Sequence, residues 1–152
     1  MESLSCGYNR LTNLDISECS SLTYLYCSVN NQLTNLDISK NTSLEHLYCI
    51  NNQLTNLDIS KNTSLEVLNC SDNQLTSLDI SKNTSLKELD CSSNQLTNLD
   101  ISGCSSLERL DCNYNELSSL DVSKNSALEH LVCDDTVTVI GYNGFIENGD
   151  ED

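Results

Sequence analysis

The chain repeats one unit of 21 residues along most of its length, and this period constrains the fold more than any other feature. Seven cysteines mark it, at positions 6, 27, 49, 70, 91, 112 and 133, with intervals of 21 residues except for one of 22. We expect the extra residue between Cys27 and Asn31. Repeats of this length form solenoids, because one unit cannot bury its own apolar side chains but stacked units can.

Each unit contains two short phrases with the alternation of a strand. In the unit that begins at Leu33, these phrases are LTNLDI at 33–38 and LEHLYC at 44–49. Each phrase reads Leu-x-x-Leu-x-apolar, and its x-Leu-x-apolar core alternates with period two, which indicates a strand; the Ser- and Asn-rich stretches between the phrases indicate turns. The pattern predicts a mainly β solenoid of about seven rungs with little or no helix. The residues expected to face inward in this rung are Leu33, Leu36, Ile38, Leu44, Leu47 and Cys49.

The charge balance and hydropathy exclude two classes of partner. Seven basic residues stand against 23 acidic ones, which gives a formal net charge of -16. Because a chain this acidic repels the phosphate backbone of nucleic acids, we expect no nucleic acid partner. No stretch approaches the roughly 18 apolar residues of a membrane helix, so we expect no membrane insertion.

Equivalent residues of successive rungs form columns, and the cysteine column is expected to lie in the core. The functional alternative is metal binding or redox chemistry, but CxxC pairs are absent and the number of cysteines is odd. We interpret these thiols as small buried hydrophobes. Cys19 and Cys104 stand apart, at a corner position that Asn41, Asn62, Asn83 and Asn125 occupy in other rungs. The NTS triplets there match glycosylation motifs, but we interpret them as corners.

A column of asparagines follows the cysteines and a column of aspartates follows the first phrase. The asparagines are expected to hold tight corners by hydrogen bonds to the backbone; they are Asn9, Asn31, Asn52, Asn73, Asn94 and Asn115. The aspartates would lie in line at rung spacing; they are Asp15, Asp37, Asp58, Asp79, Asp100 and Asp121. We expect no metal centre and no cofactor, with calcium on the aspartate column as the alternative.

Outward positions differ between the two phrases. The first phrase hardly changes from rung to rung, whereas the second varies at each outward position. We interpret the variable face as a recognition surface, with drift on a solvated face as the alternative. Aromatic residues gather on its early rungs and acidic ones on its later rungs. The candidate partner-binding residues are Tyr8, Tyr24, Tyr26, His46, Tyr48, Glu88, Asp90, Arg109, Asp111 and His130.

The motif LxxLxCxxNxLTxLDIS, as at residues 44–60, resembles the bacterial 21-residue, cysteine-type leucine-rich repeat of the internalins over roughly residues 4–133. The resemblance implies a right-handed solenoid with a parallel sheet on its concave face. It also implies an adhesin-like recognition module for protein or glycan ligands, in a secreted or cell-surface bacterial protein. The N-terminal stretch MESLSCGYNR lacks the apolar run of a signal peptide, so we expect an excised or stand-alone array.

We expect no enzymatic activity. His46 and His130 share a column but lie four rungs apart, roughly 20 Å by the spacing of strands. Each also faces away from the cysteine three residues later, because side chains alternate across a strand. A structural or self-associating array without a dedicated ligand is the alternative to a recognition module.

The two ends of the chain lead to separate predictions. We expect the solenoid to span residues 1–136, and residues 137–152 to form a C-terminal hairpin cap with an acidic, disordered tail. Asn143-Gly144 is a favourable dipeptide for the hairpin turn. The first rung begins almost at Met1 without a cover, and an unpaired edge favours association, so we expect an end-to-end homodimer or, as the alternative, an upstream segment that covers this edge.

Overall fold

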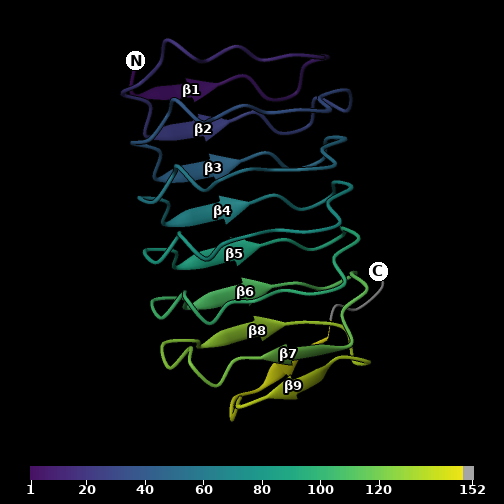
Figure 1. Cartoon of the computed structure of the whole chain (residues 1–152). Coiled ribbons are helices and arrows are strands. Elements are labelled where there is room, and N and C mark those ends of the chain that lie inside the picture. Colours follow the sequence, from purple (N-terminus) through teal and green to yellow (C-terminus); the bar gives the residue numbers. More distant parts are fainter. Residues whose placement is uncertain (149–152) are drawn as a thin grey trace.

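A computed structural model describes residues 1–148 and shows a solenoid of about seven turns (Figure 1). The described residues contain strands and turns but no helix, and so no helix that could span a membrane. The predicted mainly β solenoid is confirmed. The strands are β1 (Ser3–Ser5), β2 (Tyr24–Tyr26), β3 (His46–Tyr48), β4 (Val67–Asn69), β5 (Glu88–Asp90), β6 (Arg109–Asp111), β7 (Ser119–Asp121), β8 (His130–Val132), β9 (Thr138–Ile140) and β10 (Ile146–Glu147).

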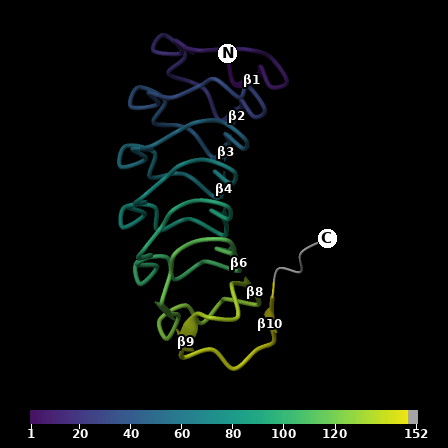
Figure 2. The ribbon, with the colours of Figure 1, turned by 90° about the vertical axis from the view of Figure 1, so that its right-hand side faces the viewer.

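Eight of these strands form one parallel sheet in the order β1-β2-β3-β4-β5-β6-β8-β10. Each strand from β1 to β6, and β8, is the x-Leu-x core of the second phrase. The leucines of these strands lie opposite one another, as Leu25 does with Leu47, and Leu131 of β8 also lies opposite Ile146 of β10. Equivalent residues therefore stack in the predicted columns. Figure 2 shows this sheet on the inner side of a gentle curve, which confirms a parallel sheet on the concave face.

The inward side chains make one continuous core along the solenoid. In the turn that begins at Leu33, all six residues expected to face inward are at most 4% exposed. A buried aliphatic side chain of this size contributes about 1.5–3 kcal/mol relative to an exposed one. The first turn is less enclosed, because Leu4, Cys6, Leu11 and Leu14 are only half-buried.

The first asparagine column holds the corner after each strand. The amide nitrogen of Asn73 donates to the carbonyl of Cys70 in its own turn, at 3.1 Å, and to that of Cys49 in the preceding turn, at 3.0 Å. Its oxygen accepts from the backbone N–H of Leu54, at 3.0 Å. One side chain thus satisfies backbone groups that the narrow coil buries away from water.

The prediction of Asn31 in this column is wrong, because Asn30 occupies the position. The Asn30 side chain is buried and donates to the carbonyl of Cys27 at 2.7 Å, whereas Asn31 is exposed with φ 58°. Asn31 is therefore the extra residue of the 22-residue interval. Within the described residues, the buried side-chain oxygen of Asn52 has no hydrogen-bond partner. By analogy with the bond from Leu54 to Asn73, the expected donor to the Asn52 oxygen is the backbone N–H of Leu33. Leu33 lies two residues after the inserted Asn31.

A second asparagine column holds the corner after the first phrase. Asn62 donates to the carbonyls of Ile38 and Asn41 in the preceding turn, at 3.1 and 2.8 Å, and is fully buried. Cys104 replaces asparagine in one turn, and its thiol lies 3.7 and 3.6 Å from the two equivalent carbonyl oxygens. The burial of these side chains confirms that the NTS triplets are corners.

The cysteine column is part of the core, as expected. All nine cysteines are free thiols, and Cys27, Cys49, Cys70, Cys91, Cys112 and Cys133 are buried. Burial raises the pKa of Cys27 and of Cys70 to about 12. The thiolate is the reactive form of cysteine, so the raised pKa and the burial both disfavour reaction of these two thiols at neutral pH.

The predicted C-terminal hairpin is wrong. β9 pairs in parallel with β7 and β10 pairs in parallel with β8, so residues 137–148 continue the coil over the last turn instead of folding back on themselves. Gly141 makes this possible: its φ is 83°, and a Cβ there would lie 2.6 Å from the Cα of Ser123. The end of the predicted acidic tail, residues 149–152, lies outside the described residues.

A valine in an unfavourable backbone conformation leads to the first prediction. Val29 has φ 57°, and its equivalent in the next turn, Asn51, has φ 53°. A β-branched residue pays about 1–2 kcal/mol in this left-handed region, which Asn tolerates. We expect Val29→Asn to raise the free energy of unfolding by about 1 kcal/mol, or the melting temperature by about 2–4 °C. Asn51→Val is the matched control and should have the opposite effect; an unchanged urea midpoint in both variants would contradict the explanation.

The accessibility of the thiols provides the second prediction. Only Cys6 and Cys19 are half-buried, and the other seven cysteines are buried. We expect the thiol reagent DTNB to titrate no more than these two in the folded protein and all nine in denaturant. Reaction of more than two thiols without loss of the fold would show that the buried cysteines are accessible to the reagent, and would contradict the prediction.

Candidate recognition face

The outward side chains of the eight-stranded sheet form two columns across the concave side, which we call the concave face. The strand pairings place Tyr24 beside His46 and Tyr26 beside Tyr48, and later Glu88 beside Arg109 and Asp90 beside Asp111. Residues far apart in the sequence thus become neighbours. The columns inferred from the repeat are those that the structure shows.

The aromatic residues of β2 and β3 form a connected cluster with Tyr8, which follows β1. The ring centroids of Tyr24 and Tyr48 are 5.6 Å apart, those of Tyr26 and Tyr48 are 6.2 Å apart, and those of Tyr24 and His46 are 6.2 Å apart. Tyr8, which is 77% exposed, stacks on Tyr26 at 6.4 Å. These separations are those of favourable aromatic pairs, so the cluster is a preformed apolar surface.

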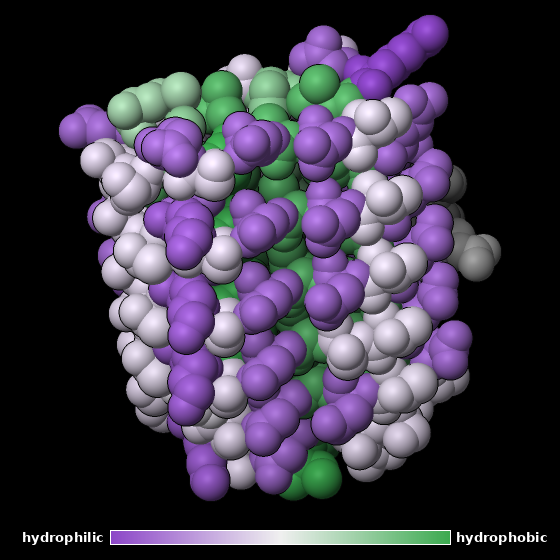
Figure 3. Space-filling model, turned by 45° about the horizontal axis from the view of Figure 1, so that its top comes forward, coloured by the Kyte–Doolittle hydropathy of each residue, from purple (hydrophilic) through white to green (hydrophobic). Residues whose placement is uncertain are grey.

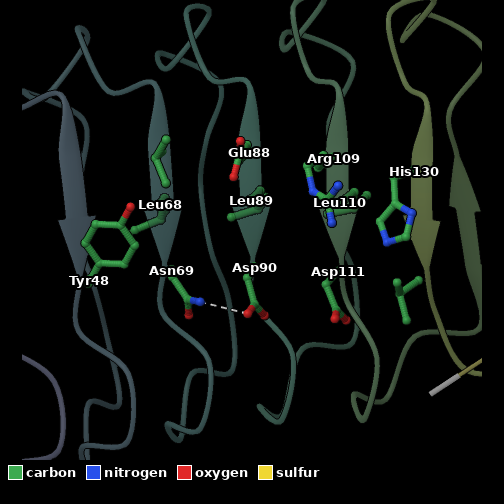
Figure 4. A pocket seen from close by; sticks show the side chains of 12 residues that line it. Tyr48, Leu68, Asn69, Glu88, Leu89, Asp90, Arg109, Leu110, Asp111 and His130 are labelled. Atoms are coloured by element: carbon green, nitrogen blue, oxygen red, sulfur yellow. Dashed lines mark hydrogen bonds between the residues drawn. The ribbon is translucent and has the colours of Figure 1, made fainter. Parts of the chain in front are cut away.

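A shallow groove of about 240 Å³ continues the face beyond this cluster. Figure 4 shows two rows of side chains in it: one with Glu88, Arg109 and His130, the other with Tyr48, Asn69, Asp90 and Asp111. The amide of Asn69 donates to the carboxylate of Asp90 at 2.8 Å. Tyr48 belongs to both the cluster and the groove, so the two patches are continuous.

The carboxylates of the groove lack strong internal cation partners. Within residues 1–148, Lys87 forms an ion pair with Glu66 at 2.8 Å, and His130 lies 3.5 Å from Glu147, an ion pair only when the imidazole is protonated; neither contact includes Arg109. Asp111 is half-buried, and its carboxylate accepts the backbone N–H of Asn113 at 3.1 Å. Burial raises the pKa of Asp111, and the charge of Asp90 adds to this effect. The groove is therefore an acidic site that a cation would stabilise.

The ten candidate residues thus divide into two adjoining patches. Tyr8, Tyr24, Tyr26, His46 and Tyr48 form the cluster, whereas Glu88, Asp90, Arg109, Asp111 and His130 line the groove with Tyr48. His46 and His130 are four strands apart in the sheet, on β3 and β8.

Some residues of the face were not among the candidates. Val67, Asn69 and Val132 line the groove, and the column alignment was sufficient to find them. Glu147 joins the face through β10, where it pairs with Val132. No periodic signal marks this segment, because it leaves the 21-residue repeat.

The opposite side of the solenoid carries the aspartate column. Figure 3 shows this side, with columns of hydrophilic side chains running from turn to turn beside an apolar strip. Each aspartate accepts the backbone N–H two residues later, as Asp37 does from Ser39 at 3.0 Å. Hydrogen bonds from the Ser39 hydroxyl and backbone lower the pKa of Asp37. Within residues 1–148, no group of three or more His, Cys, Asp or Glu side chains is placed to hold a metal ion.

Comparison with known proteins identifies the class of this chain. A family profile described as leucine-rich repeats (2 copies) matches residues 1–41, 42–83, 63–103 and 84–125. The chain belongs to the leucine-rich-repeat family. This family is defined by its repeat structure and not by a catalytic activity. Curated protein sequences gave no match to the chain.

Solved structures narrow the resemblance to internalins. The functional domain of InlJ from Listeria monocytogenes, which includes a cysteine ladder, is 38% identical with a TM-score of 0.85. The match covers 91% of this chain and 34% of that chain. The similarity to cysteine-type internalin repeats is thereby confirmed, and the present chain spans about a third of the InlJ structure.

Two less similar structures share the fold alone. An internalin (inlF) from Listeria monocytogenes is 23% identical with a TM-score of 0.82, covering 100% of this chain and 48% of that chain. A leucine-rich-repeat protein from Leptospira interrogans is 22% identical with a TM-score of 0.74, covering 91% of this chain and 44% of that chain.

The two kinds of aspartate should respond to pH with opposite signs. The pKa of Asp111 is higher in the folded protein than in the unfolded chain, so its ionised form destabilises the fold at neutral pH, and the effect is relieved as the pH falls through that pKa. We expect Asp111→Asn to raise the melting temperature at pH 7 and to leave it nearly unchanged at pH 3.

Asp37→Asn is the matched control for this experiment. The pKa of the Asp37 carboxyl group is lower in the folded protein than in the unfolded chain. Its ionised form therefore stabilises the fold above the unfolded-state pKa, and this stabilisation is lost as the pH falls through the folded-state pKa. We expect Asp37→Asn to lower the melting temperature at pH 7. If both variants shift it in the same direction at pH 7, the assignment of the two environments is wrong.

Proposed function

We propose that this chain is a non-catalytic recognition module that binds a partner protein through its concave face. The continuity of the aromatic cluster with the acidic groove carries this proposal. Tyr residues are frequent anchors of protein interfaces because they bury a large area with few rotatable bonds. A partner with an apolar patch beside a basic patch would complement both parts of the surface, and its association would weaken with added salt.

The proposal extends to the protein that contains this array. The chain is similar to the functional domain of InlJ over a third of that structure, which supports a secreted or surface-exposed bacterial protein with an adhesin-like role. A glycan is the other ligand class that a polar and aromatic face of this kind could bind. No nucleic acid partner is proposed, because the net charge is -16.

Self-association is a second candidate function. The β1 end of the sheet has an unpaired strand edge, and Leu4, Cys6 and Leu14 near it are half-buried and pack against the core. A second copy, or further turns of the same solenoid, would cover these residues. In that case the array would have a structural role, and its concave face would have no dedicated ligand.

The triple variant Tyr24→Ser, Tyr26→Ser and Tyr48→Ser tests the recognition proposal. Wild type and variant are immobilised, proteins captured from candidate host-cell surface fractions are identified, and the Kd of each purified partner is measured. We expect the variant to bind at least ~10-fold more weakly, since each buried Tyr contributes on the order of 1–2 kcal/mol at an interface.

The matched control is Asn35→Ser, Asn56→Ser and Asn98→Ser, three exposed substitutions on the opposite side. We expect it to bind like wild type. If a partner binds the Tyr variant like wild type but binds the Asn variant more weakly, recognition occurs on the opposite side of the solenoid and the proposal is wrong. Concentration-dependent dimerisation in scattering, with no heterologous partner, would favour self-association instead.

A further inference from the structure

The C-terminal segment adds a further strand to the concave face. β10 pairs in parallel with β8, with Ile146 opposite Leu131 and Glu147 opposite Val132. Leu131 faces the core, so Glu147, which follows Ile146 in β10, takes an outward position. Glu147 confirms this direction, because its carboxylate lies 3.5 Å from the ring nitrogen of His130. Phe145 directly precedes this strand, and continuing the register by one residue places it in line with His130.

Phe145 is an apolar side chain left in water at the end of this face. It is 81% exposed, more than any other large hydrophobic residue of the described part. A phenylalanine gains considerable free energy when a partner removes it from water. Phe145 is also independent of the repeat, since the segment that carries it lies outside the 21-residue period. We therefore regard it as a second apolar anchor, separate from the tyrosine cluster.

Apolar and charged groups thus follow one another across the sheet. The tyrosine cluster ends at Tyr48 on β3, the carboxylates of Asp90 and Asp111 follow on β5 and β6, and Phe145 comes last beside β10. Five strand steps separate β3 from β10 in this sheet. At about 4.8 Å per step, the two apolar anchors are roughly 24 Å apart.

The middle of this path carries an excess of carboxylates. Its carboxylates outnumber Arg109, and Arg109 forms no ion pair within residues 1–148. Asp111 is half-buried and beside Asp90 without a cation partner in an ion pair. A guanidinium group placed here would form charge-assisted hydrogen bonds with both carboxylates.

We propose that the concave face binds an extended segment of a partner protein that has basic residues at its centre and an apolar residue at each end. This rests on the proposed function and specifies its ligand. An extended chain covers about 3.3–3.6 Å per residue, so ~7 residues separate the two apolar positions. The segment crosses the strands, with one end on the tyrosine cluster, its arginines over Asp90 and Asp111, and its other end against Phe145.

Two fluorescein-labelled peptides of identical composition test this order of groups. The matched peptide is Phe-Ser-Ser-Arg-Ser-Arg-Ser-Phe, and the permuted peptide is Arg-Ser-Ser-Phe-Ser-Phe-Ser-Arg. Both are titrated with the full chain at low salt, and binding is followed by fluorescence anisotropy. We expect the matched peptide to bind ~10-fold more tightly. Equal affinities would overturn the proposal, because they would show that charge alone determines binding.

Two variants locate the contacts. Phe145→Ser should bind the matched peptide ~10-fold more weakly and the permuted peptide as wild type does, and its exposed position leaves the fold intact. The double variant Asp90→Asn with Asp111→Asn should weaken binding and flatten its dependence on salt. The double variant Asp37→Asn with Asp58→Asn, on the opposite side, removes the same number of charges and should show neither effect. A matched peptide that binds Phe145→Ser as tightly as wild type would overturn the proposal.

The peptide experiment can fail without a failure of the proposed function, and the two cases can be distinguished. If the Tyr variant loses a captured partner but the two peptides bind equally, the concave face recognises a ligand of another form, and only the present inference fails. If the Tyr variant keeps all partners and the peptides are not distinguished, both proposals fail.

Discussion

The fold depends on the register with which each turn stacks on the one before it. Leucine, isoleucine and cysteine side chains fill the same core positions in turn after turn, and buried asparagine amides satisfy the backbone at both corners. These amides supply further donors to carbonyls that the narrow coil buries, and unsatisfied buried groups are costly. Because the inward positions fix the stacking, the outward ones can vary without loss of the fold. A recognition face can therefore change while the scaffold persists.

Most of the architecture could be predicted from the period, and the exceptions have local physical causes. Asn30 and Asn31 both fit the asparagine column, and only the structure shows that Asn31 takes the left-handed conformation of an inserted residue. The hairpin was expected from Asn143-Gly144, a local turn signal. The unpaired edges of β7 and β8 offered complete rows of backbone hydrogen-bonding groups instead, and β9 and β10 pair with them. Long-range pairing thus prevailed over local preference.

The candidate face likewise has features that the repeat predicts and features that it does not. Its aromatic cluster and acidic groove follow from aligning the repeats, since strand pairing brings column members together. Phe145 could not be found in this way, because its place depends on how a non-repeating segment docks. The contrast between Asp37 and Asp111 could not be predicted from the sequence either, because the same side chain lies in different surroundings. One is exposed and hydrogen-bonded to a turn, and the other is half-buried next to a like charge.

The second asparagine column also bears on the kind of cell in which the chain can mature. Asn41, Asn62 and Asn83 each begin an Asn-Thr-Ser acceptor sequence for N-linked oligosaccharide, yet all three are fully buried and bonded to the preceding turn. An oligosaccharyltransferase acting on the nascent chain would attach a bulky sugar to a nitrogen that must enter the core. Secretion through a eukaryotic endoplasmic reticulum would thus yield glycoforms unable to close these turns, whereas a host without that enzyme imposes no such obstacle.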